Sequence, residues 1–522
     1  MAASSRFSPA IRPEDAADSQ PTLGIIGMGA MGKMYATLLA KAGWKKIHVC
    51  DLPSKYEALR RECANAPNVT VMKDGHAVAR SSDFMMYSVE AEFIDRVVAE
   101  YGPSTKMGAI VSGQTSVKAP EKDAFEKYLP EDAEIVSCHS LHGPTVSPLG
   151  QPLILIKHRA SDESLQLVEQ LFRSFGSRYV YLSYEEHDLV TANTQAVTHA
   201  AFLSMGTAWA SAKLYPWEQG LYVGGMETVK VNLALRIYSN LWHVYAGLAI
   251  LNPKAREQID QYATSVTELY KLMVEAGNKS SNSSSGFTDA DVGVGKGNEG
   301  GEGDNNDVNR NGKANGDLEK EKKLRERVEW AKDKVFGSGD SSKTNRKPIL
   351  LSQEILDKFS LGKRPRASSS PSSPSSDTSN GTQPTNNAYT PNSHLSLLAM
   401  VDCWAHLSIN PFDHLTLAAT PLFRLFLGVA EHLFLSPSLL DSAIRSAIYD
   451  TWHRSDDLEF VVAARGWSQC VRFGIFEVYR KRFEETREFF EGRFEEAGRL
   501  GSDMIKEVMK SEIEGDVSRS DD

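Results

Sequence analysis

The sequence predicts an α/β Rossmann domain at the N-terminus, followed by an all-α second domain that a long disordered insert interrupts. Three observations lead to this prediction. Short apolar runs alternate with helical patterns over 22–183, as a mostly parallel sheet with crossover helices requires. From Glu185 onward this alternation stops and long helical periodicity follows. Over 277–391 the chain is rich in Ser, Asn, Gly, Lys, Glu and Pro, and its apolar residues are too sparse to offset the entropy of ordering.

Domain boundaries are predicted from these changes in composition. We expect a disordered tail over 1–20, a dinucleotide-binding Rossmann domain over 21–183 and a mostly disordered insert over 277–391. A helical substrate and dimerisation domain is expected in two parts, over 184–276 and 392–500, followed by an acidic tail over 501–522. Within the insert, 318–334 has helical spacing and alternating charge, which favours a solvated helix.

The elements of the first domain are predicted in order from the alternation. Strands are expected at 23–26, 46–50, 69–72, 84–89, 108–112, 134–138, 153–156 and 178–182. Helices are expected near 32–41, 56–63, 93–100, 120–128 and 164–175. In the second domain the periodicity predicts helices over 191–212, 229–251, 255–275, 397–407, 415–435, 439–452, 457–470 and 473–499.

Composition narrows the class of partner. A formal net charge of −10 gives no general attraction to nucleic acid or to anionic lipid, so a small molecule is the expected ligand. The five cysteines form no C-x-x-C pair, which favours a reducing compartment, and we expect a cytoplasmic protein. The first twenty residues match neither a secretory signal nor a transit peptide. The most apolar stretch, 415–435, carries charged residues and predicts a buried helix pair, so no membrane span is expected.

A glycine-rich turn follows the first predicted strand. The segment TLGIIGMGAMG places Gly27-x-Gly29-x-x-Gly32 between that strand and a helix. There Gly27 allows a tight turn, Gly29 lets the backbone approach a pyrophosphate, and Gly32 permits close packing of helix on strand. The predicted cofactor contacts are Gly27, Met28, Gly29, Ala30, Met31, Gly32, Asp51, Ser88 and Ser112.

Asp51 ends the second predicted strand, about 20 residues after the turn. A carboxylate there is the usual partner of a ribose diol, which favours NAD. The nearby Ser54, Lys55, Arg60 and Arg61 could instead bind the 2′-phosphate of NADP or form a solvated helix face. These residues leave the choice between NAD and NADP open.

Two loops at the carboxyl ends of strands carry candidate catalytic groups. Ser116 lies in IVSGQTSVKAP, whereas His139 and His142 lie in IVSCHSLHGPTVSPLG. A histidine at such a place can act as a general base or can be a hydrogen-bonded loop residue. Its neighbour Cys138 is expected to be a core residue, because neighbours on a strand face opposite sides. The pair His139-x-x-His142 has no third ligand at a usable spacing, so no metal site is predicted.

The second domain offers candidates for substrate binding. His199 lies among Ala and Leu on a helix that begins near Glu186-His187-Asp188, and it is either a core residue or a ligand. Arg236 lies on an otherwise apolar helix, so its guanidinium needs an Asp, a Glu or a substrate carboxylate as partner. Lys230 is a weaker candidate for binding an anion.

Taken together, these segments resemble the prephenate dehydrogenase family, in particular its fungal NADP-dependent type. The resemblance rests on GMGAMG, SGQTSVK, CHSLHGP, EEHDLVTANTQAVTHAAF and LRIYSNLW, which begin at 27, 112, 138, 185 and 235. It covers roughly half the chain, from about 20 to 275. Bacterial members usually read GGHPxAG where this chain reads SCHSLHG, which leaves the role of His142 open.

The resemblance implies a reaction and roles for named residues. His139 matches the family's catalytic histidine, Ser116 the serine that hydrogen-bonds histidine and substrate, and Arg236 the arginine that grips a carboxylate. His199 matches a histidine near the substrate end of the pocket. The implied reaction is oxidative decarboxylation of prephenate to 4-hydroxyphenylpyruvate with NADP+ in tyrosine biosynthesis. The apolar helices after His394 favour a homodimer, although packing within one chain explains the same pattern.

Two alternative functions remain open. The substrate could be arogenate or another hydroxy acid, although enzymes of the latter kind usually place a lysine base where this chain offers His187, Asn193 and His199. A non-catalytic dinucleotide sensor would bind the cofactor without turnover.

Overall fold

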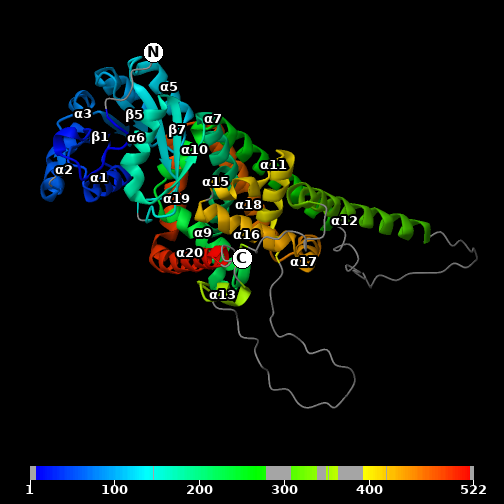
Figure 1. Ribbon diagram of the computed structural model, residues 1–522. Helices are drawn as coiled ribbons and strands as arrows, with labels where there is room; N and C mark the ends of the chain where they lie inside the picture. Colours follow the sequence, from blue (N-terminus) through cyan, green and yellow to red (C-terminus); the bar gives the residue numbers. More distant parts are fainter. Residues whose placement is uncertain are drawn as a thin grey trace, which may run out of the picture.

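The computed structural model describes residues 7–66, 68–144, 146–277, 307–337, 349–350, 352–362, 392–418 and 420–517. An α/β domain at one end of the molecule packs against a larger, all-helical domain (Figure 1). The predicted fold class, a Rossmann domain followed by helices, is confirmed.

The first domain is built on one eight-stranded sheet with the order β3-β2-β1-β4-β5-β6-β7-β8. Its strands are β1 (Leu23–Ile26), β2 (Ile47–Cys50), β3 (Val69–Val71), β4 (Phe84–Tyr87), β5 (Ile110–Gly113), β6 (Glu134–Ser140), β7 (Pro152–Arg159) and β8 (Arg178–Tyr181). All neighbours run parallel except β6 and β7, which are antiparallel. The strand order reverses between β1 and β4, and ligands of this fold bind beyond the carboxyl ends of the strands at that point.

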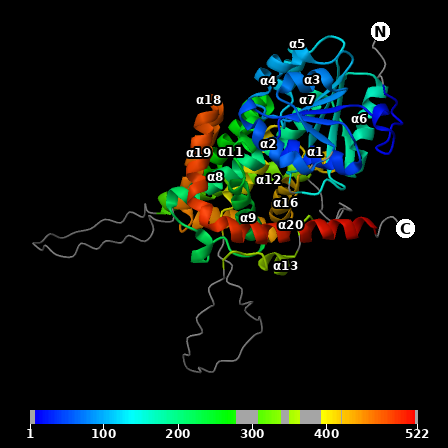
Figure 2. The same cartoon turned by 90° about the vertical axis from the view of Figure 1, so that its left-hand side faces the viewer.

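Helices cover both faces of this sheet, which is why its central strands β1, β4, β5 and β6 are buried throughout. The helices are α1 (Ala30–Ala42), α2 (Tyr56–Glu62), α3 (Gly75–Ser81), α4 (Ile94–Tyr101), α5 (Ala119–Tyr128) and α6 (Asp162–Phe172). Helices α1 and α6 pack on one face, and α3, α4 and α5 pack on the other (Figure 2). The short helix α3 was not predicted; Asp74 caps it by accepting a hydrogen bond from the Ala77 amide.

The N-terminal segment is ordered where the sequence predicted a disordered tail. Residues 7–20 are described, Ile11 is buried in the core beside α1, and Gln20 is fully buried. The Gln20 amide donates hydrogen bonds to the carbonyls of Pro13 and Asp15 and accepts one from the Lys45 amide. These contacts tie the segment to the sheet; residues 1–6 lie outside the described part.

The helical domain is a single unit made from two stretches of sequence. The first contributes α7 (Tyr184–Thr191), a π-helical turn (Ala192–Ala196), α8 (Val197–Ala212), α9 (Gly225–Ser239), α10 (His243–Leu251) and α11 (Pro253–Gly277). The second contributes α14 (Leu395–His406), α15 (Leu415–Ala418), α16 (Pro421–Phe434), α17 (Pro437–Tyr449), α18 (Arg454–Phe473), α19 (Phe476–Phe490) and α20 (Phe494–Val517). One continuous apolar core joins both stretches.

The helix predicted over 229–251 is broken in two. Helix α9 ends at Ser239, Asn240 is extended, and α10 starts at His243. The Asn240 side chain donates to the Arg236 carbonyl and to the Tyr245 hydroxyl, which satisfies the end of α9 and fixes the turn. Apolar periodicity continues across the break, so the sequence pattern alone concealed it.

The insert contains helices that belong to the fold. Helix α12 (Asp307–Phe336) includes the predicted 318–334 segment, but it is not fully solvated, because Leu324, Val328, Ala331 and Val335 are buried in the helical core. Their spacing forms one apolar stripe. The short helix α13 (Gln353–Asp357) buries Leu356. The remaining parts of the predicted disordered insert, 278–306, 338–348 and 363–391, lie outside the described residues.

The C-terminal segment also differs from the expected acidic tail. Helix α20 continues to Val517, packs against α9, and buries Met504 and Val508. These apolar side chains lie four residues apart on one face of the helix, which explains why the helix extends past 500. Residues 518–522 lie outside the described part.

The most apolar stretch of the chain forms α15 and α16, with Phe426, Leu427 and Val429 fully buried. No single described helix is long and apolar enough to cross a membrane. By length and composition alone, one bent pair, Leu422–Phe434 with Pro437–Tyr449 at 87°, could do so.

Candidate active site

The glycine turn between β1 and α1 leaves a space shaped for a phosphate group. Gly27 has a φ of +99°, which favours glycine, and a Cβ on Gly32 would collide with the Gly27 carbonyl. A Cβ on Gly29, by contrast, would meet no atom within 4 Å. No side chain caps the start of α1, so its first N–H groups are available to an anion. This turn fits the pyrophosphate of a dinucleotide.

Ser88 lies directly beside this turn. Its hydroxyl donates a 3.0 Å hydrogen bond to the Gln114 side-chain oxygen. The Gln114 Nε2 is buried and has no hydrogen-bond partner among the described residues. A buried donor without a partner is costly, so Gln114 is a further candidate to bind a ligand at this edge of the sheet. Sequence reasoning missed it, because a single glutamine after a strand carries no pattern.

The structure places Asp51 and Ser112, two further predicted cofactor residues, in different surroundings. Asp51 follows β2 and accepts a hydrogen bond from the Leu52 amide, and the Lys55 ammonium lies 3.5 Å from the same carboxylate. Ser112, however, is fully buried within β5, where its hydroxyl donates to the Cys138 sulfur. The side chain of Ser112 therefore points toward Cys138 on the neighbouring strand β6 and is not exposed at the edge of the sheet.

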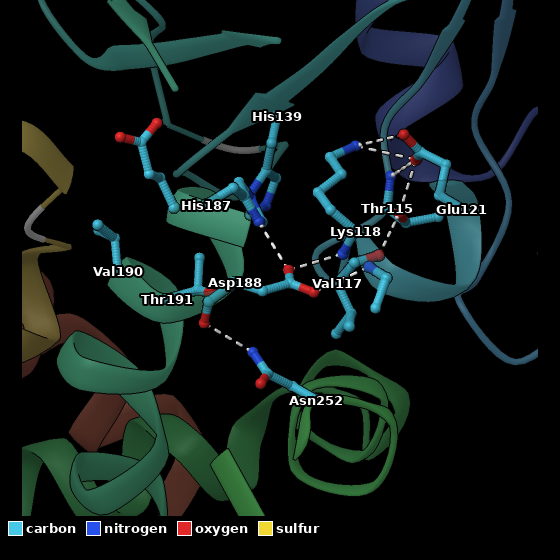
Figure 3. Close-up of polar contacts among 12 residues, drawn as sticks. Thr115, Val117, Lys118, Glu121, His139, His187, Asp188, Val190, Thr191 and Asn252 are labelled. Atoms are coloured by element: carbon cyan, nitrogen blue, oxygen red, sulfur yellow. Dashed lines mark hydrogen bonds and ion pairs between the residues drawn. The ribbon is translucent and has the colours of Figure 1, made fainter. Parts of the chain in front are cut away.

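His139 is the start of a chain of buried polar contacts that joins the two domains (Figure 3). The predicted strand ended at Cys138, whereas β6 continues to Ser140, so His139 lies within the strand as its sixth residue. Its Nδ1 lies 2.8 Å from the Nε2 of His187 on α7. The Nδ1 of His187 lies 2.9 Å from the Asp188 carboxylate. That carboxylate also accepts 2.8 Å hydrogen bonds from the amides of Lys118 and Ala119 at the start of α5.

The direction of these hydrogen bonds follows from the carboxylate, which can only accept. His187 therefore donates from Nδ1 to Asp188, and its Nε2 accepts a hydrogen bond from the Nδ1–H of His139. This assignment leaves the Nε2 of His139 without a proton. Burial, together with the charges of His187, Lys118 and His142, lowers the pKa of His139 well below its usual value. His139 is thus arranged as a neutral base.

A buried ion pair between Lys118 and Glu121 lies next to this chain of hydrogen bonds. The Lys118 ammonium contacts Glu121 at 2.9 Å and donates to the carbonyls of Gly113 and Cys138 and to the Ser137 hydroxyl. Glu121 in turn accepts hydrogen bonds from Thr115 and from Ser137. Lys118 and Glu121 are both fully buried. Their network holds the β5–α5 loop against β6. Apart from the Ser-x-Lys spacing, no sequence pattern predicts it.

The two remaining loop candidates lie in the segments that follow β5 and β6. Ser116 is half-buried in the bend between β5 and α5, two residues before Lys118. His142 follows β6, donates to the Gly143 carbonyl, and is one of the charges that lower the pKa of His139. The structure thus shows an interaction with His139 for His142, and for Ser116 only its place in the β5–α5 loop.

His199 and Arg236 meet in a second cluster around Tyr245. The ring of His199 lies 4.7 Å from that of Tyr245, and burial lowers the pKa of His199 to about 3. Arg236 acts electrostatically on the Tyr245 hydroxyl and forms a long, 3.4 Å hydrogen bond with Ser502. His199 lies twelve residues after His187 along α7, the π-helical turn and α8, and among the described residues no hydrogen bond or ion pair links this cluster to the His139 contacts.

Lys230 is placed elsewhere. Its ammonium lies 2.6 Å from the Glu227 carboxylate and 3.3 Å from the Nδ1 of His394, inside the helical domain. The structure does not group Lys230 with the other predicted substrate residues. Its charge is already paired with that of Glu227. In the part of the chain that the structure describes, no group of three or more His, Cys, Asp or Glu side chains could hold a metal ion.

A Rossmann sheet with an open glycine turn, together with a helical domain that contributes to a buried base, defines an NAD(P)-dependent oxidoreductase of the Rossmann-plus-helical class. Comparison with known families agrees: residues 22–113 match NADP oxidoreductase, coenzyme F420-dependent. Residues 196–288 and 318–510 match the 6-phosphogluconate dehydrogenase C-terminal domain. The second match resumes at 318, in agreement with the packing of α12.

Known relatives narrow the class further. The chain is 47% identical over 489 residues to a probable prephenate dehydrogenase (NADP+) of Schizosaccharomyces pombe, covering 94% of this chain and 98% of that protein. It is 46% identical over 490 residues to the prephenate dehydrogenase (NADP+) of Saccharomyces cerevisiae, covering 93% and 94%. A solved prephenate dehydrogenase from Aquifex aeolicus, 19% identical, covers 50% of this chain and 93% of its own with a TM-score of 0.41. The chain belongs to the prephenate dehydrogenase family.

Proposed function

We propose that this protein oxidises and decarboxylates prephenate to 4-hydroxyphenylpyruvate with NADP+. The observation that carries the proposal is the hydrogen-bonded chain from Asp188 through His187 to His139, which leaves a neutral imidazole nitrogen at the carboxyl end of β6. Two fungal relatives that match nearly the whole chain bear the name prephenate dehydrogenase (NADP+), which supports the substrate and the cofactor.

In the proposed reaction the Nε2 of His139 accepts the proton of the substrate's 4-hydroxyl group. The carbon that bears this hydroxyl gives up a hydride, so that a C=O bond forms there; the ring carboxylate then leaves as CO2, and its bonding electrons complete the aromatic ring. The 4-oxygen, now a phenolate, takes the proton back from His139 to give the phenol of the product. A bound nicotinamide supplies the hydride acceptor. The hydrogen bond to His187, which the Asp188 carboxylate orients, keeps the proton of neutral His139 on Nδ1, so that Nε2 is the nitrogen that accepts the substrate proton. Aromatisation makes the reaction effectively irreversible.

Arg236 is the proposed anchor for a substrate carboxylate. Among the described residues no Asp or Glu forms an ion pair with it, although it lies on a mostly buried helix. A guanidinium in such a place lacks the charge compensation that a substrate carboxylate would provide. We place Ser116 beside the reacting hydroxyl, and we place His199 and His142 at the edges of the same pocket.

The glycine turn is the proposed cradle for the cofactor phosphates, and Ser88, Gln114 and Asp51 are the polar groups at its rim. Lys55, 3.5 Å from Asp51, offsets the carboxylate charge that would repel a 2′-phosphate. Rates with prephenate and with arogenate, each with NADP+ and NAD+, test both assignments. Prephenate with NADP+ should be fastest. Faster turnover of arogenate would overturn the substrate, and faster turnover with NAD+ would overturn the cofactor.

We also propose that the protein is a homodimer in the cytoplasm. Helix α18 and the turn that leads into α19 expose large apolar side chains, among them Val462, Phe473 and Ile475, and such a surface is typical of an interface. The five free cysteines fit a reducing compartment. Light scattering with Val462→Asp tests the interface: the mass should fall from dimer to monomer, and an unchanged dimer would exclude this surface.

A further inference from the structure

The helical domain contains a cavity whose lining does not include His139. It has a volume of about 300 Å³ and lies between the C-terminal half of α8, α9, the start of α14 and α18; we call it the Tyr222 cavity. Ala208, which lines it, is 21 residues after His187 along α7 and α8, or about 30 Å of helix. Helix α7 lies beside the sheet, whereas α9 lies toward the opposite side of the helical domain (Figure 1).

Aromatic side chains form much of the wall of the Tyr222 cavity. Trp209, Tyr222, Trp452 and Phe460 all line it. The rings of Trp209 and Tyr222 lie 5.6 Å apart and edge to face, so each presents a defined surface. The Lys230 ammonium already lies over the Tyr222 ring, 5.3 Å from its centre. A cation therefore fits the faces of this wall.

Lys230 does not make the cavity positive. Its ammonium is 2.6 Å from the Glu227 carboxylate, so these two charges cancel. His394, which contacts both, adds no charge: burial and the nearby Lys230 lower the pKa of His394 well below its usual value. An anionic ligand would find no uncompensated positive charge in this group.

Two aspartates in the first turn of α18 bring carboxylates to the cavity wall. Asp457 is buried and accepts hydrogen bonds from Ser393 and His453. Asp456, half-buried on the same helix, lines the cavity and forms no ion pair with any Lys or Arg among the described residues. Burial and the neighbouring Asp457 raise the pKa of Asp456. Burial and the charges of Glu227, Asp457 and Asp456 likewise raise the pKa of Tyr222.

We propose that the Tyr222 cavity binds a small organic ammonium ion, with its amine at the Asp456 carboxylate and its apolar body against the rings of Trp209, Tyr222 and Trp452. An uncompensated, partly buried carboxylate is stabilised by a cation, and aromatic faces bind the ammonium group and its adjoining carbon atoms. A volume of about 300 Å³ lies in the range of small-molecule sites.

The test uses 2-phenylethylamine as the probe and the full chain as the protein. Binding is followed by calorimetry and by the fluorescence of the tryptophans that line the cavity. Saturable binding is expected, and 2-phenylethanol, which replaces the ammonium with a neutral hydroxyl, should bind at least tenfold more weakly. Equal affinity for the alcohol, or no binding of the amine, would overturn the proposal.

Variants assign the binding to this cavity. Asp456→Asn removes the charge at nearly constant shape and should weaken 2-phenylethylamine about tenfold or more. Asp503→Asn, the same change at an exposed residue of α20, should leave the affinity unchanged. Trp452→Leu removes one aromatic wall at a residue that is 38% exposed, so folding should persist while affinity falls. Unaltered affinity in Asp456→Asn and Trp452→Leu would place the amine elsewhere and overturn the proposal.

Discussion

The Nδ1 of His139 lies 2.8 Å from the Nε2 of His187, and this hydrogen bond connects the last strand of the parallel part of the sheet to the first helix of the second domain. Neither residue alone defines a base. His187 and Asp188 select the tautomer of His139, and the β5–α5 loop holds Asp188 through two backbone amides. The proposed chemistry thus depends on how the two domains meet.

Asp188→Asn should lower kcat by about 10- to 100-fold, the usual effect of losing a group that orients a functional imidazole. The amide can donate to His187, which permits the tautomer that is wrong for His139. KM for prephenate should change little, and steady-state kinetics measure both. The matched control is Glu185→Gln, which alters a surface partner of Lys122 on the same helix and should leave kcat unchanged. An unaltered kcat in Asp188→Asn would remove the positioning role.

The dependence of kcat/KM on pH should report the low pKa of His139. Activity requires the neutral imidazole, and burial lowers the pKa of His139 well below its usual 6.5. Protonation therefore occurs only in more acidic solution, and kcat/KM should stay level as pH falls through 6.5 and decline below it. A decline centred at or above pH 6.5 that disappears in His139→Asn would contradict the assigned environment.

Two glycine variants separate cofactor binding from folding. Gly29→Ala places a methyl group where no atom of the chain lies within 4 Å, so stability should be retained while NADP+ affinity falls by at least tenfold. Gly32→Ala forces a collision with the Gly27 carbonyl and should lower the free energy of unfolding. Calorimetric titration and denaturant unfolding measure the two effects. Normal NADP+ affinity in Gly29→Ala would show that the phosphates bind elsewhere.

Lys118→Met should destabilise the first domain by about 3–5 kcal/mol, because it leaves the buried Glu121 without its cation. Lys122→Met, four residues later, breaks a partly exposed pair and should cost about 1 kcal/mol or less. Denaturant unfolding compares the two. Adding Glu121→Met to Lys118→Met should recover stability, since no unpaired charge remains. Equal stabilities for Lys118→Met and Lys122→Met would mean that the buried pair contributes nothing.

The sequence was sufficient to predict the strands of the first domain and its helices other than α3, and the physical reason is local. Each strand is a short apolar run between turn residues, and the glycine turn combines a strand, a helix and Asp51 at one spacing. Contacts between segments that are far apart in the sequence could not be predicted from local patterns. His139 and His187 are 48 residues apart, and only the folded chain shows that they meet.

Boundaries failed where a long-range contact competes with local composition. The polar segment around α12 looks solvated, yet the stripe from Leu324 to Val335 is buried against the rest of the helical domain. Helix α20 runs from Phe494 through most of the predicted acidic tail, because Met504 and Val508 are buried against the rest of the domain. Conversely, the apolar periodicity over 229–251 hid the break at Asn240, which a single side chain stabilises.

The central claim is that His139 is the base, and comparing turnover with cofactor binding in His139→Asn tests it most directly. Asn is close in size and can donate a hydrogen bond to His187, but it cannot accept a proton at neutral pH. We predict that kcat falls by about two to four powers of ten while the dissociation constant of NADP+ stays within about twofold. Wild-type turnover in this variant would contradict the account.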